Sequence, residues 1–244
     1  MSCRPRLQYA VRSDPGRQRP NNEDRALVGF VAPFALVCDG MGGEAGGEVA
    51  SHIASEAIAA ALDGAWPWKD IDDILVASVV AAGDRIRGVA RADPKLARMG
   101  TTATVAAVHG DWLVCAQVGD SRAYLLRDGH LVQVTRDQTL VEWLKASGVE
   151  AVGDDIPSNV ILQAVGSSVR LDVVVSRTPF RSGDVALLCS DGLSGVVDDH
   201  VIEAILVTHV DPNAAADALV AVANEAGGPD NITVVVLRND ALEK

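Results

Sequence analysis

Apolar and polar residues along this chain alternate with two periods, one typical of β-strands and the other of amphipathic helices. Short apolar runs bounded by turn residues predict strands at residues 7–12, 25–31, 34–38, 101–108, 112–118, 123–126, 131–134, 171–176, 184–189 and 232–238. Longer stretches with helical periodicity predict helices at residues 47–62, 71–89, 138–147, 198–208 and 212–226. Residues 148–158, which contain glycine, proline and two aspartates, predict an irregular surface loop.

The order of these elements predicts the fold class. Strands follow one another in hairpins and helices come in pairs, which indicates an α+β fold of antiparallel sheets with helices packed outside. The run Phe34–Cys38 is apolar throughout, so we expect it to be buried on both faces. In the first helix we expect Ser51 to lie off a buried stripe that consists of Ile53, Ala57, Ala60 and Ala61.

Composition and charge narrow the class of protein. Apolar residues make up 48% of the 244 and charged residues 22%, which excludes a disordered chain. We expect a single domain over residues 1–244. Acidic residues outnumber basic ones 33 to 21, and the net charge of −12 argues against nucleic acid or an anionic membrane as the partner. An anionic substrate would therefore need a cation between itself and the protein.

The sequence predicts a cytoplasmic location. The segment Met1–Leu7 lacks the apolar core of a signal peptide, and no run approaches the about 18 apolar residues of a membrane span. The four cysteines show no regular spacing. Cys38, Cys115 and Cys189 lie in apolar strand-like runs, so we interpret them as reduced residues of the core.

Acidic residues stand at the ends of several predicted strands, beside glycine or in a tight turn. They are Asp39 before Gly40, Asp120 after Gly119, Asp191 before Gly192, Asp230 before Asn231, and the pair Glu23 and Asp24. Each one alone is a common turn signal. Antiparallel strands bring their ends to a shared rim, however, where clustered carboxylates would repel one another unless cations bound there.

Such a rim suits the hard divalent ions Mg²⁺ and Mn²⁺, whose ligands are carboxylates, backbone carbonyls and water. Gly40 has no side chain to cover its carbonyl oxygen. Two ions about 3.5–4 Å apart generate a hydroxide at neutral pH and clamp a phosphoryl group, so they would also supply the positive field. Arg19 could hold phosphate oxygens through its guanidinium, with an ordinary surface arginine as the alternative.

The segment Gly40–Ala45 offers a competing interpretation, because it fits the dinucleotide-binding pattern G-x-G-x-x-A between a strand and a helix. Asp39, Glu44 and Glu48 surround the place where a pyrophosphate would lie, and their charge has the wrong sign. A second helix follows residues 66–68, where a βαβ unit needs its next strand. We therefore do not expect a dinucleotide site.

Six motifs occur in order along nearly the whole chain, from about residue 8 to 238. They are Arg19-x-x-Asn22-Glu23-Asp24, Asp39-Gly-Met-Gly-Gly43, Gly100-Thr-Thr102, Gly119-Asp-Ser-Arg122, Ser190-Asp-Gly-Leu193 and Asp230-Asn-Ile-Thr233. This set resembles the metal-dependent (type 2C) serine/threonine protein phosphatases of the bacterial type. The resemblance implies a four-layer αββα sandwich, two central antiparallel β-sheets flanked by helix pairs. It also implies a centre of two Mn²⁺ or Mg²⁺ ions at one end, and a variable flap at about residues 145–165.

The resemblance assigns the catalytic and principal metal-binding roles. Asp39 would bridge the two ions, and Gly40 would be a ligand through its carbonyl oxygen. Asp191 and Asp230 would hold one of the ions. The implied catalytic set is thus Asp39, Asp191 and Asp230, around a metal-bridging hydroxide that attacks phosphorus directly.

The remaining roles also come from the resemblance. Glu23 would bind the other ion through water, with Asp24 in support. Arg19 would bind the phosphoryl group of the substrate. Asp120 would belong to a third, weaker metal site. We expect Asn231 to fix the turn that aims Asp230, and Gly100–Thr102 to have a structural role.

Three positions depart from the family pattern. Met41 stands where many eukaryotic members have a histidine thought to protonate the leaving group, so we expect water to be the acid. Gly195 replaces a frequent aspartate and removes one expected ligand of the third ion. Residues Asp137–Thr139 read Asp-Gln-Thr in place of the more usual Asp-His-Ser.

The resemblance implies a cytoplasmic phosphatase that acts on phosphoserine and phosphothreonine in proteins, including targets of a serine/threonine kinase. The alternative is a catalytically weak or inactive module that keeps the fold and binds a regulatory protein partner. A further interpretation keeps the chemistry and takes an anti-anti-sigma-type regulator as the substrate. The sequence itself identifies neither the substrate, the native metal nor the oligomeric state.

Overall fold

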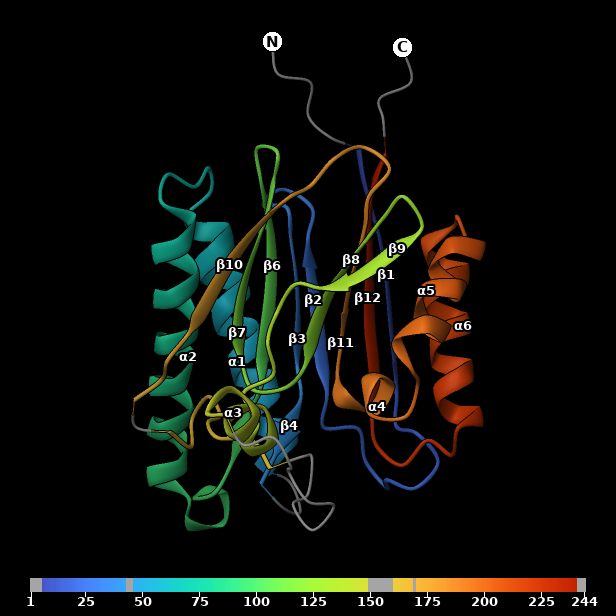
Figure 1. Ribbon diagram of the computed structural model, residues 1–244. Helices are drawn as coiled ribbons and strands as arrows, with labels where there is room; N and C mark the ends of the chain where they lie inside the picture. Colours follow the sequence, from blue (N-terminus) through green and yellow to red (C-terminus); the bar gives the residue numbers. More distant parts are fainter. Residues whose placement is uncertain (1–5, 43–45, 149–159, 169, 241–244) are drawn as a thin grey trace.

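The computed structural model describes residues 6–42, 46–148, 160–168 and 170–240. Two five-stranded antiparallel sheets lie face to face, and a pair of helices covers the outer face of each (Figure 1). The α+β class and the four-layer αββα sandwich are therefore confirmed. Within the described residues, every helix is too short or too polar to cross a membrane.

One sheet has the strand order β1-β12-β11-β8-β9. These strands are β1 (Arg6–Asp14), β12 (Ile232–Asp240), β11 (Val185–Cys189), β8 (Arg122–Arg127) and β9 (His130–Gln133). The first and last strands of the chain pair with each other. Asp128 and Gly129 join β8 to β9 with φ values of 51° and 80°, which is the two-residue turn that suits twisted hairpins.

The other sheet has the order β10-β7-β6-β3-β2. Its strands are β10 (Val174–Pro179), β7 (Trp112–Val118), β6 (Ala103–His109), β3 (Phe34–Cys38) and β2 (Arg25–Gly29). All five residues of β3 are buried, as its continuous apolar run predicted. Beyond β3, the short strands β4 (Gly40–Met41) and β5 (Gly100–Thr101) pair with each other.

Helices complete the outer layers. α1 (Gly46–Gly64) and α2 (Ile71–Ala92) cover the β3 sheet, while α5 (Asp199–Thr208) and α6 (Pro212–Glu225) cover the β12 sheet (Figure 1). The shorter elements are η1 (Pro94–Leu96), α3 (Leu140–Ala146) and α4 (Asp191–Ser194). Since α1 leads into α2 and the sheets are antiparallel, the residues that the structure describes contain no βαβ unit of the kind that a dinucleotide site would need.

Apolar side chains fill all three interfaces between the layers. Successive residues of a strand point to opposite faces, so one strand serves two interfaces. Leu36 packs toward α1 and α2, and its neighbour Val37 packs between the sheets. Likewise Leu187 packs toward α5 and α6, and Leu188 packs between the sheets. All four are fully buried, which explains why these central strands are apolar throughout.

Several predicted strands have other bounds in the structure, and the one predicted at 25–31 ends at Gly29. The strand predicted at 171–176 is β10, Val174–Pro179, because Leu171 and Val173 pack against the helix-side core before the strand begins. The strand predicted at 101–108 is interrupted at Thr102, whose N–H donates to the carbonyl oxygen of Asp39 at 2.8 Å. Most of the loop predicted at 148–158 lies outside the described residues.

The expected stripe of the first helix is confirmed only in part, because Ala57 is buried and Ile53 packs against the helix-side core but Ala60 does not. The structure buries Ala50, Ala54, Ile58 and Leu62 along with Ala57, whereas Ala60 is exposed. Ser51 is also buried, because its hydroxyl donates to the carbonyl oxygen of Glu23. Helix α1 thus faces both the sheet and the segment before β2, a second contact that periodicity alone does not reveal.

The inter-sheet core should dominate stability. We expect Leu188→Ala to lower the free energy of unfolding by about 2–5 kcal/mol, because it leaves a cavity between two rigid sheets. Val207→Ala, on the exposed side of α5, is the control and should change it by less than about 0.5 kcal/mol. Urea unfolding followed by circular dichroism measures both, and similar values for the two variants would contradict the assignment of this core.

Candidate active site

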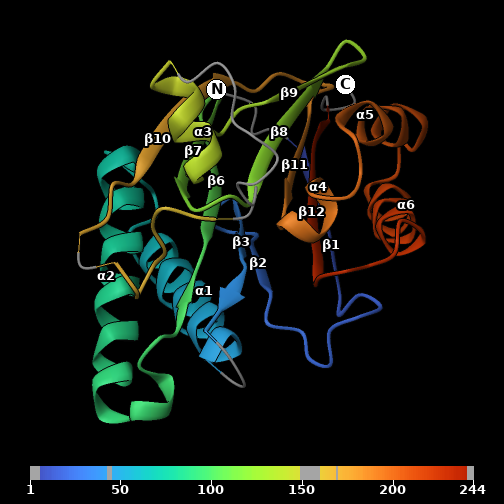
Figure 2. The ribbon, with the colours of Figure 1, turned by 60° about the horizontal axis from the view of Figure 1, so that its bottom comes forward.

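The predicted acidic residues meet at one end of the sandwich, where β4 and α4 lie (Figure 1; in Figure 2 this end is turned forward). A pocket of 390 Å³ opens there. Its walls consist of Arg19, Pro20, Asn21, Glu23, Asp39, Gly40, Met41, Gly42, Thr102, Asp120, Ile161, Asp191, Asp230 and Asn231. The structure therefore brings together every predicted site residue except Asp24.

The acidic residues come from the ends of strands in both sheets. Asp39 directly follows β3, and Asp191 begins α4 one residue after β11. Asp120 lies in the connection between β7 and β8. Glu23 precedes β2 and Asp230 precedes β12. As expected of antiparallel sheets, strands that end here and strands that begin here alternate, so one rim collects side chains from distant parts of the sequence.

Gly40 occupies a position that only glycine fits. A Cβ atom there would overlap the carbonyl oxygen of Gly47, at the start of α1, and approach the carbonyl oxygen of Glu23 to 2.6 Å. The absence of a side chain therefore allows the backbone of Gly40 to pass between α1 and the segment before β2. Gly40 lines the pocket, and the contact of its carbonyl oxygen with a metal ion stays a prediction.

Thr102 supports Asp39 from the neighbouring strand connection. The Asp39 N–H donates to Thr102 Oγ1 at 2.9 Å, and the Thr102 N–H donates back to the Asp39 carbonyl oxygen. The Thr102 hydroxyl also lies 2.7 Å from the hydroxyl of Ser121, beside Asp120. The threonine is buried, so these bonds fix the backbone of Asp39 relative to the Asp120 turn. This is the structural role expected of Gly100–Thr102.

Asn231 organises two acidic segments at once. Its Oδ1 accepts from the Glu23 N–H at 2.8 Å, and its Nδ2 donates to the carbonyl oxygens of Pro15 and Asn21 at 3.0 and 2.8 Å. Its own N–H donates to Asp230 Oδ1 at 2.8 Å. The expected turn at Asp230 is present, and the bond to Glu23 is a further function that the sequence did not reveal.

Among the described residues that line the pocket, Arg19 is the one with a cationic side chain. Its guanidinium donates to Asp230 Oδ2 at 2.7 Å, and 53% of the side chain remains exposed. The negative charge of Asp230 raises the pKa of Arg19 above its ordinary value, and Asp191 and Asp39 add to the effect. Arg19 is thus a permanent positive charge at the mouth of an acidic pocket.

Burial and neighbouring negative charge raise the pKa values of several carboxyl groups in the pocket. Burial is the largest cause for Asp39, followed by the charges of Asp24 and Asp191, and its pKa lies well above the ordinary value. Burial and the charge of Asp191 raise the pKa of Asp120 to about 7. For Asp191, burial and then the charge of Asp230 raise the pKa, partly offset by Arg19. The pocket contains more negative charge than its single arginine can balance.

Asp24 lies behind the pocket wall and not in it. Ser190, the residue before Asp191, donates its hydroxyl to Asp24 Oδ2 at 2.7 Å. Burial raises the pKa of Asp24 to about 7, although the hydrogen bond from Ser190 opposes the shift. Its position joins the Glu23 segment to the start of α4. This placement is compatible with a supporting role and with no direct contact to a ligand in the pocket.

Two observations show that these residues fit divalent cations. Oδ1 of Asp191 is buried in the pocket wall without a hydrogen-bond partner, and buried carboxylate oxygens otherwise find donors. The raised pKa values indicate uncompensated negative charge, which a cation would neutralise. The donors are hard oxygens, the ligands of Mg²⁺ and Mn²⁺. The carboxylates line the walls, and within the described residues no three of them converge on a single point.

The structure also places the residues that depart from the family pattern. Met41 lines the pocket and carries no ionisable group. Gly195 is absent from the pocket wall, and its N–H donates to the carbonyl oxygen of Asp191 at 2.7 Å. Glycine at 195 therefore ends α4 behind Asp191.

Ile161 is a pocket residue that sequence reasoning missed. It lies in the expected flap, of which residues 149–159 are outside the described part of the chain. Ile161 forms an isolated bridge with Thr139, and the Leu140 N–H donates to the carbonyl oxygen of Val160 at 2.8 Å. No periodic pattern marks such a short pairing, so only the folded chain shows that it forms a wall of the pocket.

Comparisons with known proteins point to one family. The sequence profile described as Protein phosphatase 2C matches residues 28–142. The serine/threonine protein phosphatase PstP of Mycobacterium tuberculosis is 40% identical over 233 residues, which are 94% of this chain and 44% of PstP. The chain thus spans less than half the length of PstP. The serine/threonine phosphatase stp of Listeria monocytogenes is 34% identical over 249 residues, which cover 96% of each chain.

Solved structures give the same result. The crystal structure of M. tuberculosis PstP superimposes with a TM-score of 0.89 at 39% identity, over 96% of this chain and 99% of that one. A crystal structure of the catalytic domain of PstP in complex with two manganese ions superimposes with a TM-score of 0.88 at 39% identity, with the same coverage. The four-layer sandwich is therefore shared with a structure that contains two manganese ions.

The pH dependence of stability tests the electrostatics of the pocket. Since the pKa of Asp120 is raised to about 7, the folded protein between roughly pH 4 and 7 holds a proton that the unfolded chain has lost, and the metal-free protein should lose stability as the pH rises through this window. We expect Asp120→Asn to stabilise the metal-free protein by about 1–4 kcal/mol at pH 8 and to have little effect at pH 4.

Urea unfolding in the presence of a chelator measures this difference. Asp63→Asn, at the exposed end of α1, is the matched control and should change stability little at either pH. If Asp120→Asn instead destabilised the metal-free protein at pH 8, contacts within the chain would have to stabilise the Asp120 carboxylate, and the prediction would be wrong.

Proposed function

This chain belongs to the protein phosphatase 2C family, and we propose that it hydrolyses phosphoserine and phosphothreonine in proteins with the help of two divalent metal ions. The observation that carries this proposal is the pocket itself. It combines the carboxylates of Asp39, Asp120, Asp191 and Asp230, in excess of the available positive charge, with a single arginine at its mouth. Such a pocket binds cations first, and through them an anionic phosphate ester.

The proposed metal ligands follow from the pocket and the family resemblance. Asp39, the carbonyl oxygen of Gly40, Asp191 and Asp230 hold the two ions, Mn²⁺ or Mg²⁺, and Glu23 takes part through water. When bound, the ions lower the pKa of water and neutralise the charge of the phosphoryl group. A third, weaker ion beside Asp120 is part of the proposal. With Gly195 behind Asp191, that site has one ligand fewer than is frequent in the family.

Arg19 orients the substrate. Its bond to Asp230 uses one of the five N–H donors of the guanidinium, and the side chain lines the pocket with 53% of its surface exposed. A phosphate ester offers oxygens that match this planar group. Asp230 also holds Arg19 in place through this bond. The same carboxylate would therefore bind a metal ion and position the arginine that binds the substrate. Met41 cannot supply a proton to the leaving oxygen, so water does.

The wider setting follows from the same site. The described chain forms one domain, because the inter-sheet core joins residues from Leu7 to Leu237. Its substrates are phosphorylated proteins, including targets of a serine/threonine kinase, and the acidic net charge disfavours nucleic acids and anionic membranes as partners. The buried free thiols of Cys38, Cys115 and Cys189 support a reducing location, the cytoplasm.

Loss of a metal ligand should abolish turnover. We expect Mn²⁺-dependent hydrolysis of p-nitrophenyl phosphate, suppressed by EDTA, and a loss of roughly 100-fold or more in kcat/KM for Asp39→Ala and Asp230→Ala. Circular dichroism should show the fold retained, and Asp63→Ala is the control for removal of a distant acidic side chain. Near wild-type rates in either pocket variant would refute the site. An inactive wild-type protein that still binds Mn²⁺ would favour the regulatory binding module.

Arg19 should act mainly through substrate binding. We expect Arg19→Ala to raise KM by roughly tenfold or more with a smaller change in kcat, because a charge-assisted hydrogen bond to the phosphoryl group is lost. Arg17, an exposed arginine two residues away that does not line the pocket, provides the control variant Arg17→Ala. Steady-state kinetics on a phosphothreonine peptide distinguish the two, and an unchanged KM would remove Arg19 from the substrate-binding residues.

A further inference from the structure

Gln138 lies at the junction between two walls of the pocket. Its backbone N–H donates to the carbonyl oxygen of Gly119 at 3.0 Å, next to Asp120. Its backbone carbonyl accepts from the N–H of Leu162 at 2.8 Å, next to Ile161. Asp120 and Ile161 both line the pocket. One residue therefore connects an acidic wall to the apolar wall formed by the return of the flap segment.

The side-chain amide of Gln138 also links the Asp120 turn to the segment that contains Ile161. Its Oε1 accepts from the Gly119 N–H at 2.8 Å and from Gln163 Nε2 at 2.9 Å. Its Nε2 donates to the carbonyl oxygens of Gln117 at 3.3 Å and Asp172 at 3.2 Å. A primary amide has two donors and an acceptor oxygen with two lone pairs, so all of its capacity is used.

The orientation of this amide is fixed by its partners. The backbone N–H of Gly119 can only donate, and the two carbonyl oxygens can only accept, so exchanging the oxygen and nitrogen of the amide would oppose like groups. A neutral histidine, the more usual family residue here, has one donor and one acceptor in its ring and could meet half of these partners. Glutamine at 138 is therefore suited to this junction in a way that the family pattern does not provide.

Gln163 completes the junction on the flap side. Its Nε2 also donates to the carbonyl oxygen of Asp172 at 2.8 Å, and its Oε1 accepts from the Asp172 N–H at 2.9 Å. We call Gln138 and Gln163 the amide pair. Gln138 hydrogen-bonds to both the Asp120 turn and the flap return, whereas the hydrogen bonds of the Gln163 side chain within the described part of the chain go to Gln138 and Asp172.

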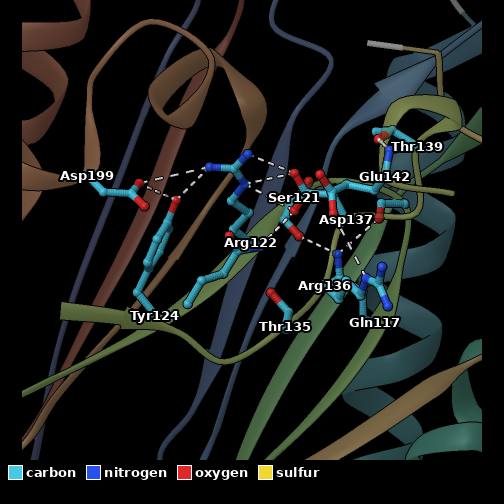
Figure 3. A network of polar contacts seen from close by, with 12 residues as sticks. Gln117, Ser121, Arg122, Tyr124, Thr135, Arg136, Asp137, Thr139, Glu142 and Asp199 are labelled. Carbon is cyan, nitrogen blue, oxygen red and sulfur yellow. Dashed lines mark hydrogen bonds and ion pairs between the residues drawn. The ribbon is translucent and has the colours of Figure 1, made fainter. Parts of the chain in front are cut away.

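An independent ion pair holds the neighbouring backbone. Arg122 forms a bidentate contact with Asp137 at 2.7 to 3.0 Å, and it also bonds Tyr124, which in turn bonds Asp199 on α5 (Figure 3). The Thr139 side chain caps α3 by accepting from the Glu142 N–H. These contacts flank Gln138 on either side and do not use its amide. Removal of the amide should therefore leave the segment attached to β8.

We propose that Gln138 is a positioning residue for protein substrates, which holds the Ile161 wall at a fixed place opposite the carboxylates. This inference rests on the proposed phosphatase function and concerns its selectivity. A small aryl phosphate depends on the metal ligands and Arg19, which the amide pair does not touch. A phosphorylated polypeptide extends beyond the phosphate and must also fit against the wall that contains Ile161.

The test compares two substrates in three variants that each replace an amide by an apolar group of similar size. With Mn²⁺ present, Gln138→Leu and Gln163→Leu should raise KM for a phosphothreonine peptide by roughly tenfold. They should leave kcat, and the kcat/KM for p-nitrophenyl phosphate, within about twofold. Gln133→Leu is the matched control, because Gln133 bonds Asp137 at 2.7 Å and lines neither wall. This variant should leave the kinetic constants for both substrates unchanged.

Equal losses of kcat/KM for the peptide and for p-nitrophenyl phosphate would overturn the proposal. A general loss of structure or a displaced Asp120 would impair the hydrolysis of both substrates alike. An unchanged KM for the peptide would overturn it as well. Backbone hydrogen exchange supplies a readout independent of activity: exchange at Gly119 and Leu162 should be about tenfold faster in Gln138→Leu than in wild type and unchanged in Gln133→Leu.

The two levels of the hypothesis can fail separately. Wild-type protein without activity on either substrate would refute the proposed function. The positioning role would then be judged by hydrogen exchange, and equal protection in Gln138→Leu and wild type would overturn it.

Discussion

Repulsion among carboxylates collected at one rim is the constraint on which the rest of this structure depends. Asp39, Asp120 and Asp191 are half-buried, and burial together with neighbouring carboxylates raises the pKa of each: Asp24 and Asp191 act on Asp39, Asp191 acts on Asp120, and Asp230 acts on Asp191. Partly buried carboxylates that lie close together are unfavourable unless cations pair with them. Among the described residues of the pocket, however, Arg19 is the one cationic side chain. The arrangement is stable only because two sheets and a continuous core hold strand ends that electrostatics alone would push apart. Strained electrostatics of this kind is typical of sites that await a charged ligand.

Uncharged polar residues hold the acidic residues in place relative to the two sheets by hydrogen bonds. The Thr102 hydroxyl fixes the backbone of Asp39, the Ser190 hydroxyl bonds Asp24, and the Asn231 side chain accepts from the Glu23 N–H while its backbone N–H donates to Asp230. Each is buried and each bonds a backbone group or a carboxylate, so none adds charge to a site that already has an excess. Neutral donors and acceptors are thus the means by which the fold positions repelling groups without neutralising them.

The flap side of the pocket is built differently. The wall around Ile161 belongs to no sheet, and its attachment to the Asp120 turn depends on the backbone and amide of Gln138. The acidic wall therefore takes its position from the two sheets, whereas the apolar wall is held by the bonds of Gln138, by the bonds between Val160–Ile161 and Thr139–Leu140, and by the bridge between Val165 and Thr101. A division of this kind separates chemistry from recognition, because the residues that contact a substrate's polypeptide can vary without disturbing the metal ligands.

The sequence by itself determined the layers and most of the site. Apolar period and turn residues predicted the central strands and the four long helices, since strands such as Phe34–Cys38 are buried on both faces and leave a clear pattern. The Asp-Gly strand ends and the ordered motifs identified the acidic residues that line the pocket. Only the tertiary structure decided which face of α1 is buried, where β10 begins, that Asp24 lies behind the wall, and that Asn231 and Ile161 complete it. These features arise from contacts between segments far apart in the chain, and neither local propensity nor periodicity contains information about such partners.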